Sequence, residues 1–417
     1  MMAICLSDRP KHVLFVSSSK GYQRVNPSRS SQRLTDLARE APVAAVHAFP
    51  ALRLAETPGS LALSDADQFD SWQKGLRRAV LDRVADFVAT RCADELGACG
   101  VDVAADILVK FVDGGKCLRS TFMYLGWLCG APASDAALSA TASLELLHAF
   151  ALLQDDVMDD SASRRGRPAA HIQFADWHSQ RRLSGSSRRF GESAAILLGD
   201  LCLIWAEQML RDSGLQNRHL VQVWPRYDAM RTELAVGQFA DLAIDVHELP
   251  TLEAVLEVAR RKSGNYTVRR PLEIGAAMAG CDEQVLAALG DYGSAIGEAF
   301  QMRDDILGIF GSPAATGKPN KDLIERKATS VVVAAYQLAD GPGRRQLRQL
   351  MTSDRLDDAA LDRWRTLIVA TGAVQWIEEL IAGRVQEARN ALELSMIDHP
   401  ITAALLDMAG LCTQRAA

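Results

Sequence analysis

Two clusters of aspartates stand at the ends of apolar, helix-forming segments of this chain. The first reads Asp-Asp-Val-Met-Asp-Asp from Asp155, and the second is Asp304-Asp305. Carboxylates in apolar surroundings must be paired with cations or must hold a metal ion. Asp155 and Asp159 lie one helical turn apart on one face, where they repel each other unless a cation lies between them. No Cys or His set accompanies them, so the pattern favours Mg²⁺ shared with the phosphate oxygens of a diphosphate.

Basic residues follow each acidic cluster and would suit the same substrate. Arg164 and Arg165 come shortly after the first cluster, and Lys318 and Lys327 come after the second. A third set, GGKCLR at residues 114–119, opens a helix, where free backbone N–H groups also favour anions. Each set alone is typical of a solvated surface. Their alternation with acids at three places favours a diphosphate that is held partly by metal ions and partly by direct contacts.

The segments that carry these residues read as helices. Apolar residues at spacings of three and four begin with Phe69 and Trp72. From there to the C-terminus, helical patterns alternate with glycine- and proline-rich turns, and residues 179–193 read as a loop rich in Ser, Arg and Gly. We therefore expect an all-α protein with two parts. Residues 1–75 would be a poorly ordered N-terminal extension, and residues 76–417 one helical domain.

Composition limits the class of protein. The chain has 417 residues, of which 48% are hydrophobic and 24% charged, which is enough for a large core. The formal net charge of -6 argues against a nucleic-acid partner. The eight cysteines lack metal-binding spacing and are expected to be free thiols, which favours a reducing, cytoplasmic location. No uncharged apolar run is long enough for a membrane span, so none is expected.

From residue 76 onward, the order of motifs resembles that of the trans-isoprenyl diphosphate synthases, the polyprenyl synthetase family. The resemblance implies the isoprenoid synthase fold, a single large helical bundle around a central cavity. It implies condensation of isopentenyl diphosphate with an allylic diphosphate (dimethylallyl, geranyl or farnesyl), Mg²⁺ as cofactor with up to three ions per active site, and a homodimer. The motifs are GGKxxR at Gly114–Arg119, ELxHxxxLxxDDxxD at Glu145–Asp159, RRGxP at Arg164–Pro168, GESxAILxGD at Gly191–Asp200, KSxxYT at Lys262–Thr267, FQxxDD at Phe300–Asp305 and GKPxxDLxExKxT at Gly317–Thr329.

Carried over residue by residue, the resemblance assigns roles within these motifs. Asp155, Asp159 and Asp304 would bind the Mg²⁺ ions that grip the allylic diphosphate, and Lys262 would join them in catalysis. Departure of that diphosphate would leave an allylic carbocation for the isopentenyl double bond to attack, and the released diphosphate would take the proton. The implied ligands of isopentenyl diphosphate are Lys116, Arg119, His148 and Arg165, and those of the allylic diphosphate are Arg164, Lys262, Ser263, Gln301, Lys318 and Lys327.

Residues just before Asp155 are expected to set the length of the product. Phe150 and Leu147 are expected to point down the cavity in which a growing chain would run, and an aromatic at 150 resembles farnesyl diphosphate synthases. Ala151 and the stretch Tyr266–Pro271 look more like bacterial geranylgeranyl diphosphate synthases. We expect a product of C15 to C20, with geranylgeranyl diphosphate favoured over farnesyl diphosphate.

The second aspartate cluster departs from the family pattern, because Gly308 stands where a third acidic residue is usual and leaves Asp304 to hold the ion. Two other classes of protein stay open. A class I terpene cyclase shares the helical fold and a DDxxD cluster. It needs a different second metal motif, however, and lacks the basic set for isopentenyl diphosphate. A non-catalytic partner subunit of another synthase usually loses an aspartate motif, whereas the assigned ligands are present here.

Overall fold

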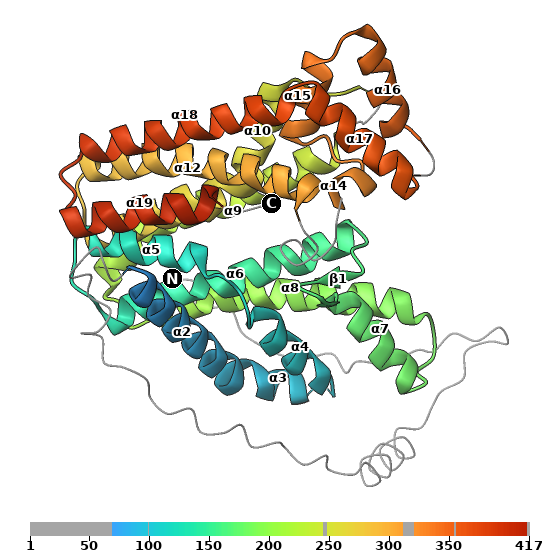
Figure 1. Cartoon of the computed structure of the whole chain (residues 1–417). Coiled ribbons are helices and arrows are strands. Elements are labelled where there is room, and N and C mark those ends of the chain that lie inside the picture. Colours follow the sequence, from blue (N-terminus) through green and yellow to red (C-terminus); the bar gives the residue numbers. More distant parts are fainter. Residues whose placement is uncertain (1–68, 99, 245–247, 312–320, 354–355, 415–417) are drawn as a thin grey trace, which may run out of the picture. The chain divides into compact units, whose positions relative to one another are not determined.

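The computed structural model describes residues 69–98, 100–244, 248–311, 321–353 and 356–414, and these are almost entirely helical (Figure 1). The first helix, α2 (Phe69–Phe87), begins ahead of the expected boundary at residue 76. The rest of the expected N-terminal extension lies outside the described residues. Within the described part of the chain, the only strands are the short antiparallel pair β1 (Ser163–Arg164) and β2 (Arg167–Pro168). The expected all-α class is therefore confirmed.

The other elements follow in chain order. They are η4 (Val88–Cys92), α3 (Ala93–Ala98), α4 (Asp102–Val112), α5 (Leu118–Leu128), α6 (Asp135–Met158), α7 (Ala170–Gln180), α8 (Ser187–Arg211), α9 (Asn217–Leu242), α10 (Leu252–Ala259), η5 (Arg260–Arg269), α11 (Arg270–Ala279), α12 (Glu283–Phe310), α14 (Lys321–Ile324), α15 (Ser330–Leu338), α16 (Gly341–Met351), α17 (Asp358–Ala370), α18 (Ala373–Glu393) and α19 (His399–Thr413).

The expected loop at residues 179–193 is wrong at both of its ends. Helix α7 continues to Gln180 and α8 begins at Ser187, so only residues 181–186 connect the two helices. The side chain of Ser186 accepts a hydrogen bond from the backbone N–H of Arg189 and caps α8. One turn further, Arg188 donates to Glu192 at 2.8 Å. Serines and arginines that indicate a loop by composition therefore form the capped first turns of a helix.

Two buried apolar clusters hold the helices together. The larger runs from α2 through α9 and includes η5, α11, α19 and the first half of α12. The smaller joins α10, α14, α15, α16, α17 and α18 to the second half of α12. In Figure 1, α12 lies beside α18, and α6 lies beside α8. Because α12 belongs to both clusters, packing holds it along its length, and the smaller cluster holds the C-terminal end that carries the second aspartate cluster.

Two of the described helices, α6 and α8, are long and apolar enough to cross a membrane by length and composition alone. The most apolar stretch of α6 is 67% buried within the protein, as expected of a core helix, and that of α8 is 44% buried. A helix in the core of a soluble protein has the same composition, so the finding is weak support for a span. The expected absence of a membrane span stays a prediction.

Helices α5 and α11 approach each other backbone to backbone, because both have glycine at the contact. A Cβ atom on Gly126 would lie 3.0 Å from the backbone N of Ala276. A Cβ atom on Gly275 would lie 2.8 Å from the backbone N of Trp127 and still closer to the carbonyl oxygen of Met123. This contact sets the distance between the start of α5 and the segment before α11, both of which carry residues of the site described below.

We expect Gly275→Ala to destabilise the protein, because the added methyl group meets backbone atoms that cannot rotate away. Overpacking of this kind costs about 1–3 kcal/mol of the free energy of unfolding, which denaturant titration followed by circular dichroism measures. The control is Gly383→Ala in α18, where a Cβ atom would meet nothing within 4 Å. This change should stabilise the helix by roughly 0.5–1 kcal/mol. Equal stability of Gly275→Ala and the wild type would contradict the backbone contact.

Candidate active site

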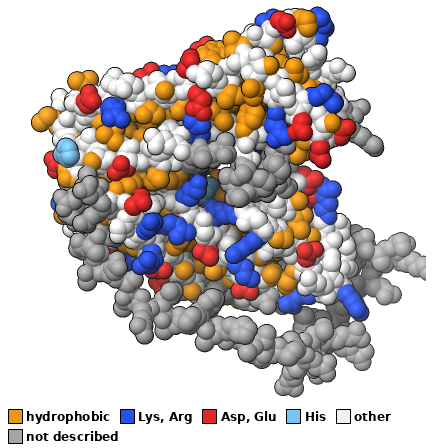
Figure 2. All heavy atoms as spheres, viewed as in Figure 1, with side chains coloured by type: hydrophobic (Ala, Val, Ile, Leu, Met, Phe, Trp, Pro, Cys, Tyr) orange, Lys and Arg blue, Asp and Glu red, His pale blue; other side chains and the backbone are white. Residues whose placement is uncertain are grey.

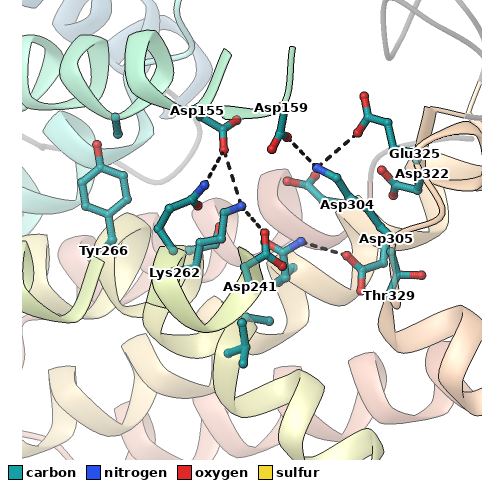
Figure 3. A pocket seen from close by; sticks show the side chains of 18 of the residues that line it. Asp155, Asp159, Asp241, Lys262, Tyr266, Asp304, Asp305, Asp322, Glu325 and Thr329 are labelled. Atoms are coloured by element: carbon teal, nitrogen blue, oxygen red, sulfur yellow. Dashed lines mark hydrogen bonds and ion pairs between the residues drawn. The ribbon is translucent and has the colours of Figure 1, made fainter. Parts of the chain in front are cut away.

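A cavity of about 970 Å³ is lined by residues of α5, α6, α9, α10, η5 and α12 and of the segment from α14 to α15. Seven Asp and Glu side chains and six Lys and Arg side chains face it, together with apolar residues such as Leu152 and Leu234. Figure 3 shows carboxylates from opposite walls turned toward one another, with lysines between them. In Figure 2, Lys and Arg side chains gather near the middle of one face, in the region where Figure 1 draws α4, α5 and α6.

Helix α6 ends in the first acidic cluster and presents two of its carboxylates to the cavity. Asp155 and Asp159 line the cavity, as their spacing predicts. Asp156, between them in sequence, is only 1% exposed and accepts hydrogen bonds from Nε and Nη2 of Arg164 at 2.9 and 2.5 Å. Arg164 also donates to Asp155 at 3.3 Å. Burial alone would lower the pKa of Arg164, but the bonds to Asp156 raise it, so a firm cation stands beside the cluster.

Arg164 and Arg165 are neighbours in sequence, but their side chains contact different parts of the protein. They belong to the hairpin of β1 and β2, whose turn residues Arg165 and Gly166 both have positive φ, at 52° and 74°, as type I′ turns require. Arg164 lines the cavity, whereas Arg165 is not among the lining residues. Instead, Arg165 donates to the carbonyl oxygens of Phe111 at 2.9 Å and Asp113 at 3.3 Å, beside the GGK segment.

Two of the expected ligands of isopentenyl diphosphate, Arg119 and His148, lie beside Tyr266. Lys116, Arg119 and His148 all line the cavity. The guanidinium carbon of Arg119 lies 4.2 Å from the centre of the Tyr266 ring, and Arg119 Nη2 donates to Thr267 Oγ1 at 2.9 Å. Nε of Arg119 is buried without a hydrogen-bond partner among the described residues, which leaves a donor for an anion.

His148 in this group is a neutral imidazole. Its Nδ1 lies 3.5 Å from the Tyr266 hydroxyl. Burial, with Arg119, Arg165 and Arg164 nearby, holds the pKa of His148 well below 6.5. Burial also raises the pKa of Tyr266 to about 12, so its hydroxyl keeps its proton at neutral pH. Both groups can therefore act as hydrogen-bond donors in this part of the cavity.

Lys262 lies between two carboxylates that come from different helices. Its Nζ lies 2.5 Å from Asp241 Oδ2 on α9 and 3.5 Å from Asp155 Oδ1 on α6. Gln238, also on α9, donates to the same oxygen of Asp155 at 3.4 Å. Ser263 follows Lys262 and lines the cavity as well. The lysine thus ties the wall formed by α9 and η5 to the first acidic cluster.

The helix that carries Lys262 is of the π type, which recurs at functional sites, and glycines fix its position. A Cβ atom on Gly237 would lie 2.7 Å from Cα of Lys262, so α9 meets η5 at the lysine itself. On the opposite side, a Cβ atom on Gly297 of α12 would lie 2.7 Å from the carbonyl oxygen of Gly264. Backbone contacts with α9 on one side and with α12 on the other therefore fix the position of the backbone from which the Lys262 side chain extends.

The paired aspartates of α12 both line the cavity but differ in their surroundings. Asp305 is buried and accepts hydrogen bonds from the backbone N–H of Ser330 at 2.9 Å, the Ser330 hydroxyl at 2.6 Å and Gln301 Nε2 at 2.8 Å. Burial raises the pKa of Asp305, and these hydrogen bonds oppose the shift. Asp305 therefore joins α12 to the start of α15, while Gln301 stands at the cavity wall and supports it.

Lys327 links the first acidic cluster to the segment between α14 and α15. Its Nζ lies 2.9 Å from Oδ2 of Asp159, at the end of α6, and 3.2 Å from Oε2 of Glu325 on its own segment. Burial alone would lower the pKa of Lys327, but Asp159 and Glu325 raise it, so it remains a cation. Lys318, the other expected basic residue of this segment, lies outside the described residues.

The expected chain-length residues differ in how they meet the cavity. Ala151 lines it. Leu147 lies one helical turn earlier on the same face of α6 and is fully buried. Phe150 is half-buried and does not line the cavity; it lies one turn before Gln154, whose amide donates to Asp200 of α8 at 3.1 Å. The role of Phe150 as the cavity floor stays a prediction.

Several lining residues escaped the sequence analysis. They include Gln238 and Asp241, in the stretch Gly-Gln-Phe-Ala-Asp at the end of α9. A glutamine and an aspartate three apart on one helix face could have indicated them. Tyr266 and Glu325 lie inside motifs that were recognised, but without a role of their own. An acidic residue or tyrosine gives little sign in sequence of which cavity it faces.

The donor set suits divalent cations shared with a phosphate ligand. Among the described residues, no three Asp, Glu, His or Cys side chains already stand close enough to hold a metal ion. The lining carries nearly equal numbers of carboxylates and basic groups, so an incoming diphosphate would bring excess negative charge. Mg²⁺ binds through one or two carboxylates with waters and substrate phosphates, which is the combination that this cavity offers.

The chain is similar in sequence to proteins of a known family. Residues 102–368 match the family model described as polyprenyl synthetase. A geranylfarnesyl diphosphate synthase of Aeropyrum pernix is 31% identical over 285 residues, covering 67% of this chain and 83% of that protein. A geranylgeranyl diphosphate synthase of Mycobacterium tuberculosis is 32% identical over 281 residues, covering 67% of this chain and 75% of that protein.

A solved structure is similar over most of the chain. It is the geranylgeranyl pyrophosphate synthase of Corynebacterium glutamicum, crystallised with isoprenyl diphosphate and magnesium. The TM-score is 0.77 at 33% sequence identity, and the match covers 85% of this chain and 100% of that one. That enzyme and this chain therefore share the same helical fold.

The neutral, partly buried His148 should make the stability of the protein depend on pH. In the unfolded chain, His148 takes up a proton below about pH 6.5, whereas in the folded chain its lowered pKa prevents this. The stability it contributes is complete above pH 6.5 and is lost as the pH falls below that value. We expect His148→Gln to flatten the fall in unfolding free energy between pH 7 and 5 by up to about 1.4 kcal/mol per pH unit.

Denaturant titrations at several pH values measure this slope. Replacement of the exposed His399 by Gln is the matched control. The same slope in His148→Gln and the wild type would mean that His148 does not resist protonation.

Proposed function

The chain belongs to the polyprenyl synthetase family and is a prenyltransferase that makes short isoprenyl diphosphates, and we propose that it condenses isopentenyl diphosphate with dimethylallyl, geranyl or farnesyl diphosphate. The observation that carries this proposal is the pair of acidic walls, one from α6 and one from α12, on a single cavity that also holds a separate basic group around Tyr266. A reaction that joins two diphosphate substrates needs two such anion sites next to each other.

Asp155, Asp159 and Asp304 are the residues that we propose hold Mg²⁺, up to three ions, at the allylic diphosphate. Bound cations supply positive charge for the departing diphosphate. Lys262 and Lys327 each touch a carboxylate of α6 within 3.5 Å, so both can turn to phosphate oxygens when the charge there changes. Arg164, Ser263, Gln301 and Lys318 complete the proposed allylic set.

Lys116, Arg119, His148 and Arg165 form the proposed site for isopentenyl diphosphate. Arg119 is held by Tyr266 and Thr267 and keeps a buried Nε donor available. Neutral His148 can donate one N–H without adding charge. The apolar wall that includes Ala151, Leu152 and Leu234 would surround the allylic carbocation and exclude water from it, so the isopentenyl double bond is the nucleophile at hand.

We propose a product of C15 to C20, with geranylgeranyl diphosphate favoured. Ala151, a small residue, lines the cavity directly below Asp155 and leaves room for a chain. Leu147, fully buried one turn further down the same face, would limit that room. Relatives that make geranylfarnesyl and geranylgeranyl diphosphates support a product in this range or slightly longer.

A second copy of this chain is the proposed partner. Helices α8 and α9 are joined by an ion pair between Glu207 and Arg231 at 3.0 Å, and both carry large apolar side chains in solvent. Leu197 and Ile204 on α8 are 63% and 60% exposed, and Phe239 on α9 is 77% exposed. Coverage by a second copy would explain the apolar character of α8 without a membrane. Free thiols at Cys117, Cys129, Cys202, Cys281 and Cys412 fit the proposed cytoplasmic location.

The purified protein with Mg²⁺, isopentenyl diphosphate and each allylic starter should yield an elongated isoprenyl diphosphate, detected by chromatography of the dephosphorylated product. Asp155→Ala should lower turnover by roughly 10²- to 10³-fold or more, because the departing diphosphate loses its charge stabilisation. A hydrocarbon product would instead favour a terpene cyclase. No elongation with any starter would favour a non-catalytic subunit and would contradict the proposed function.

Leu147→Ala should lengthen the product, because it opens space below Ala151 on the cavity face of α6. Phe150→Ala should also lengthen it, but by less, since Phe150 stands on the face toward α8. Leu153→Ala is the matched control: Leu147 and Leu153 are both fully buried on α6 and neither lines the cavity, but Leu153 is two residues from Ala151 and therefore points to another face of the helix. Each Leu→Ala change costs about 2–5 kcal/mol of stability, so folding is checked by thermal unfolding. Equal lengthening by Leu147→Ala and Leu153→Ala would exclude Leu147 as the floor.

A further inference from the structure

The connector between α4 and α5, residues 113–117, carries Lys116 to the proposed site for isopentenyl diphosphate but cannot fix its own shape. Gly114 and Gly115 are consecutive, and Gly114 has a φ of 85°. Glycine adopts a wider range of backbone conformations than any other residue, so a Gly-Gly pair is intrinsically variable. Lys116 follows directly and lines the cavity. Its place therefore depends on contacts that other elements make with the connector.

Arg77 of α2 makes one of these contacts. Its Nε donates a hydrogen bond of 2.7 Å to the carbonyl oxygen of Gly115, to which the Cys117 thiol is a weaker second donor at 3.9 Å. Arg77 itself is not among the residues that line the cavity. The carbonyl of Gly115 and the N–H of Lys116 belong to one planar trans peptide and point in opposite directions. The bond from Arg77 therefore holds the peptide from which Lys116 extends and turns its N–H away from α2.

Helix α2 is a firm support for this hydrogen bond. Leu76, next to Arg77, and Val80, about one turn later, are fully buried in the larger apolar cluster. The helix contacts α4, α5 and α6, so it packs against both of the helices that the connector joins. Arg77 is half-buried where these helices meet α2. A donor on a packed helix can hold the Gly115 carbonyl at a defined place.

A second arginine holds the same connector from the hairpin of β1 and β2. Arg165 donates to the carbonyl oxygens of two residues at the end of α4. Nη2 of Arg165 and Oε2 of Glu145 each lie 3.5 Å from the place where a Cβ atom on Gly115 would stand. The glycine pair is therefore bounded by groups from α6 and the hairpin, and its carbonyl is bonded from α2.

We infer that Arg77 is a positioning residue for isopentenyl diphosphate, because it holds the Gly115 carbonyl and thereby the lysine that follows. The inference rests on the proposed function, which supplies this substrate. Arg77 lies before residues 102–368, which match the family model, and outside all of the motifs that assigned the site. Helix α2 thus takes part in substrate binding without contacting the substrate.

Replacement of Arg77 by Gln and by Met separates the hydrogen bond from the charge. Nε2 of glutamine is as many bonds from Cα as Nε of arginine, so Arg77→Gln can still donate to Gly115, whereas Arg77→Met cannot. Arg77→Met should raise the KM for isopentenyl diphosphate by roughly 10-fold, the effect of one lost hydrogen bond. Arg77→Gln should restore most of the affinity. Because only binding at one site is weakened, kcat and the KM for the allylic substrate should not change.

Arg77→Lys keeps the charge but has a carbon atom in place of Nε, so it should behave like Arg77→Met. Arg78→Met is the matched control, since Arg78 is the next residue of α2, is exposed and loses the same charge. It should have the KM of the wild type. Calorimetric titration with isopentenyl diphosphate in the absence of Mg²⁺ measures the same affinities without turnover, and circular dichroism checks that each variant is folded.

An unchanged KM for isopentenyl diphosphate in Arg77→Met would overturn the inference. An equal rise in Arg77→Gln and Arg77→Met, with Arg77→Lys like the wild type, would also overturn it, because the charge and not the hydrogen bond would then matter. Failure of the proposed function is seen separately: the wild type itself would neither bind isopentenyl diphosphate nor form an isoprenyl product.

Discussion

Carboxylates that line one cavity repel one another, and in this protein lysines relieve the repulsion by reaching across from the facing elements. Lys262 on η5 lies between Asp155 and Asp241, and Lys327 lies between Asp159 and Glu325. These pairs are partly buried, so their attraction is stronger than at a free surface. They also tie α6 to η5 and to the segment before α15. An anion that brings its own cations can replace either the carboxylate or the lysine of such an ion pair. The ion pairs can therefore stabilise the cavity and still open when such an anion binds.

The fold and part of the site could be predicted from the sequence, because long helices with regular apolar spacing are the elements most readily recognised in a sequence. Asp155 and Asp159 repeat at one helical turn, so their common direction follows from spacing alone. Asp304 and Asp305 are different: neighbours on a helix point about 100° apart, so both reach the cavity but only Asp305 also accepts hydrogen bonds from Ser330. Apolar residues on nearly every side of α12 conceal which of the two is held by Ser330.

Contacts between distant segments are what the sequence could not reveal. Asp241 reads as a solvated acid near a helix end, and only its approach to Lys262 gives it a place in the site. Arg77 reads as a solvated cation on a helix, although its Nε bonds the carbonyl oxygen of Gly115. Gly237 and Gly297 likewise read as weak points within helices, yet they admit the backbone of η5 on two sides. In each case, the meaning of a residue depends on an element that meets it from another part of the chain.

The hairpin of β1 and β2 has a bearing on how such a protein can change over time. Arg164 and Arg165 are consecutive, yet one pairs with the acidic end of α6 and the other bonds the backbone at the end of α4. A turn of two residues with positive φ leaves no slack between them. Insertion or deletion of one residue would turn both guanidinium groups to new surroundings at once. A change in the length of this segment would therefore disturb both proposed diphosphate sites together, whereas a substitution can alter one of them alone.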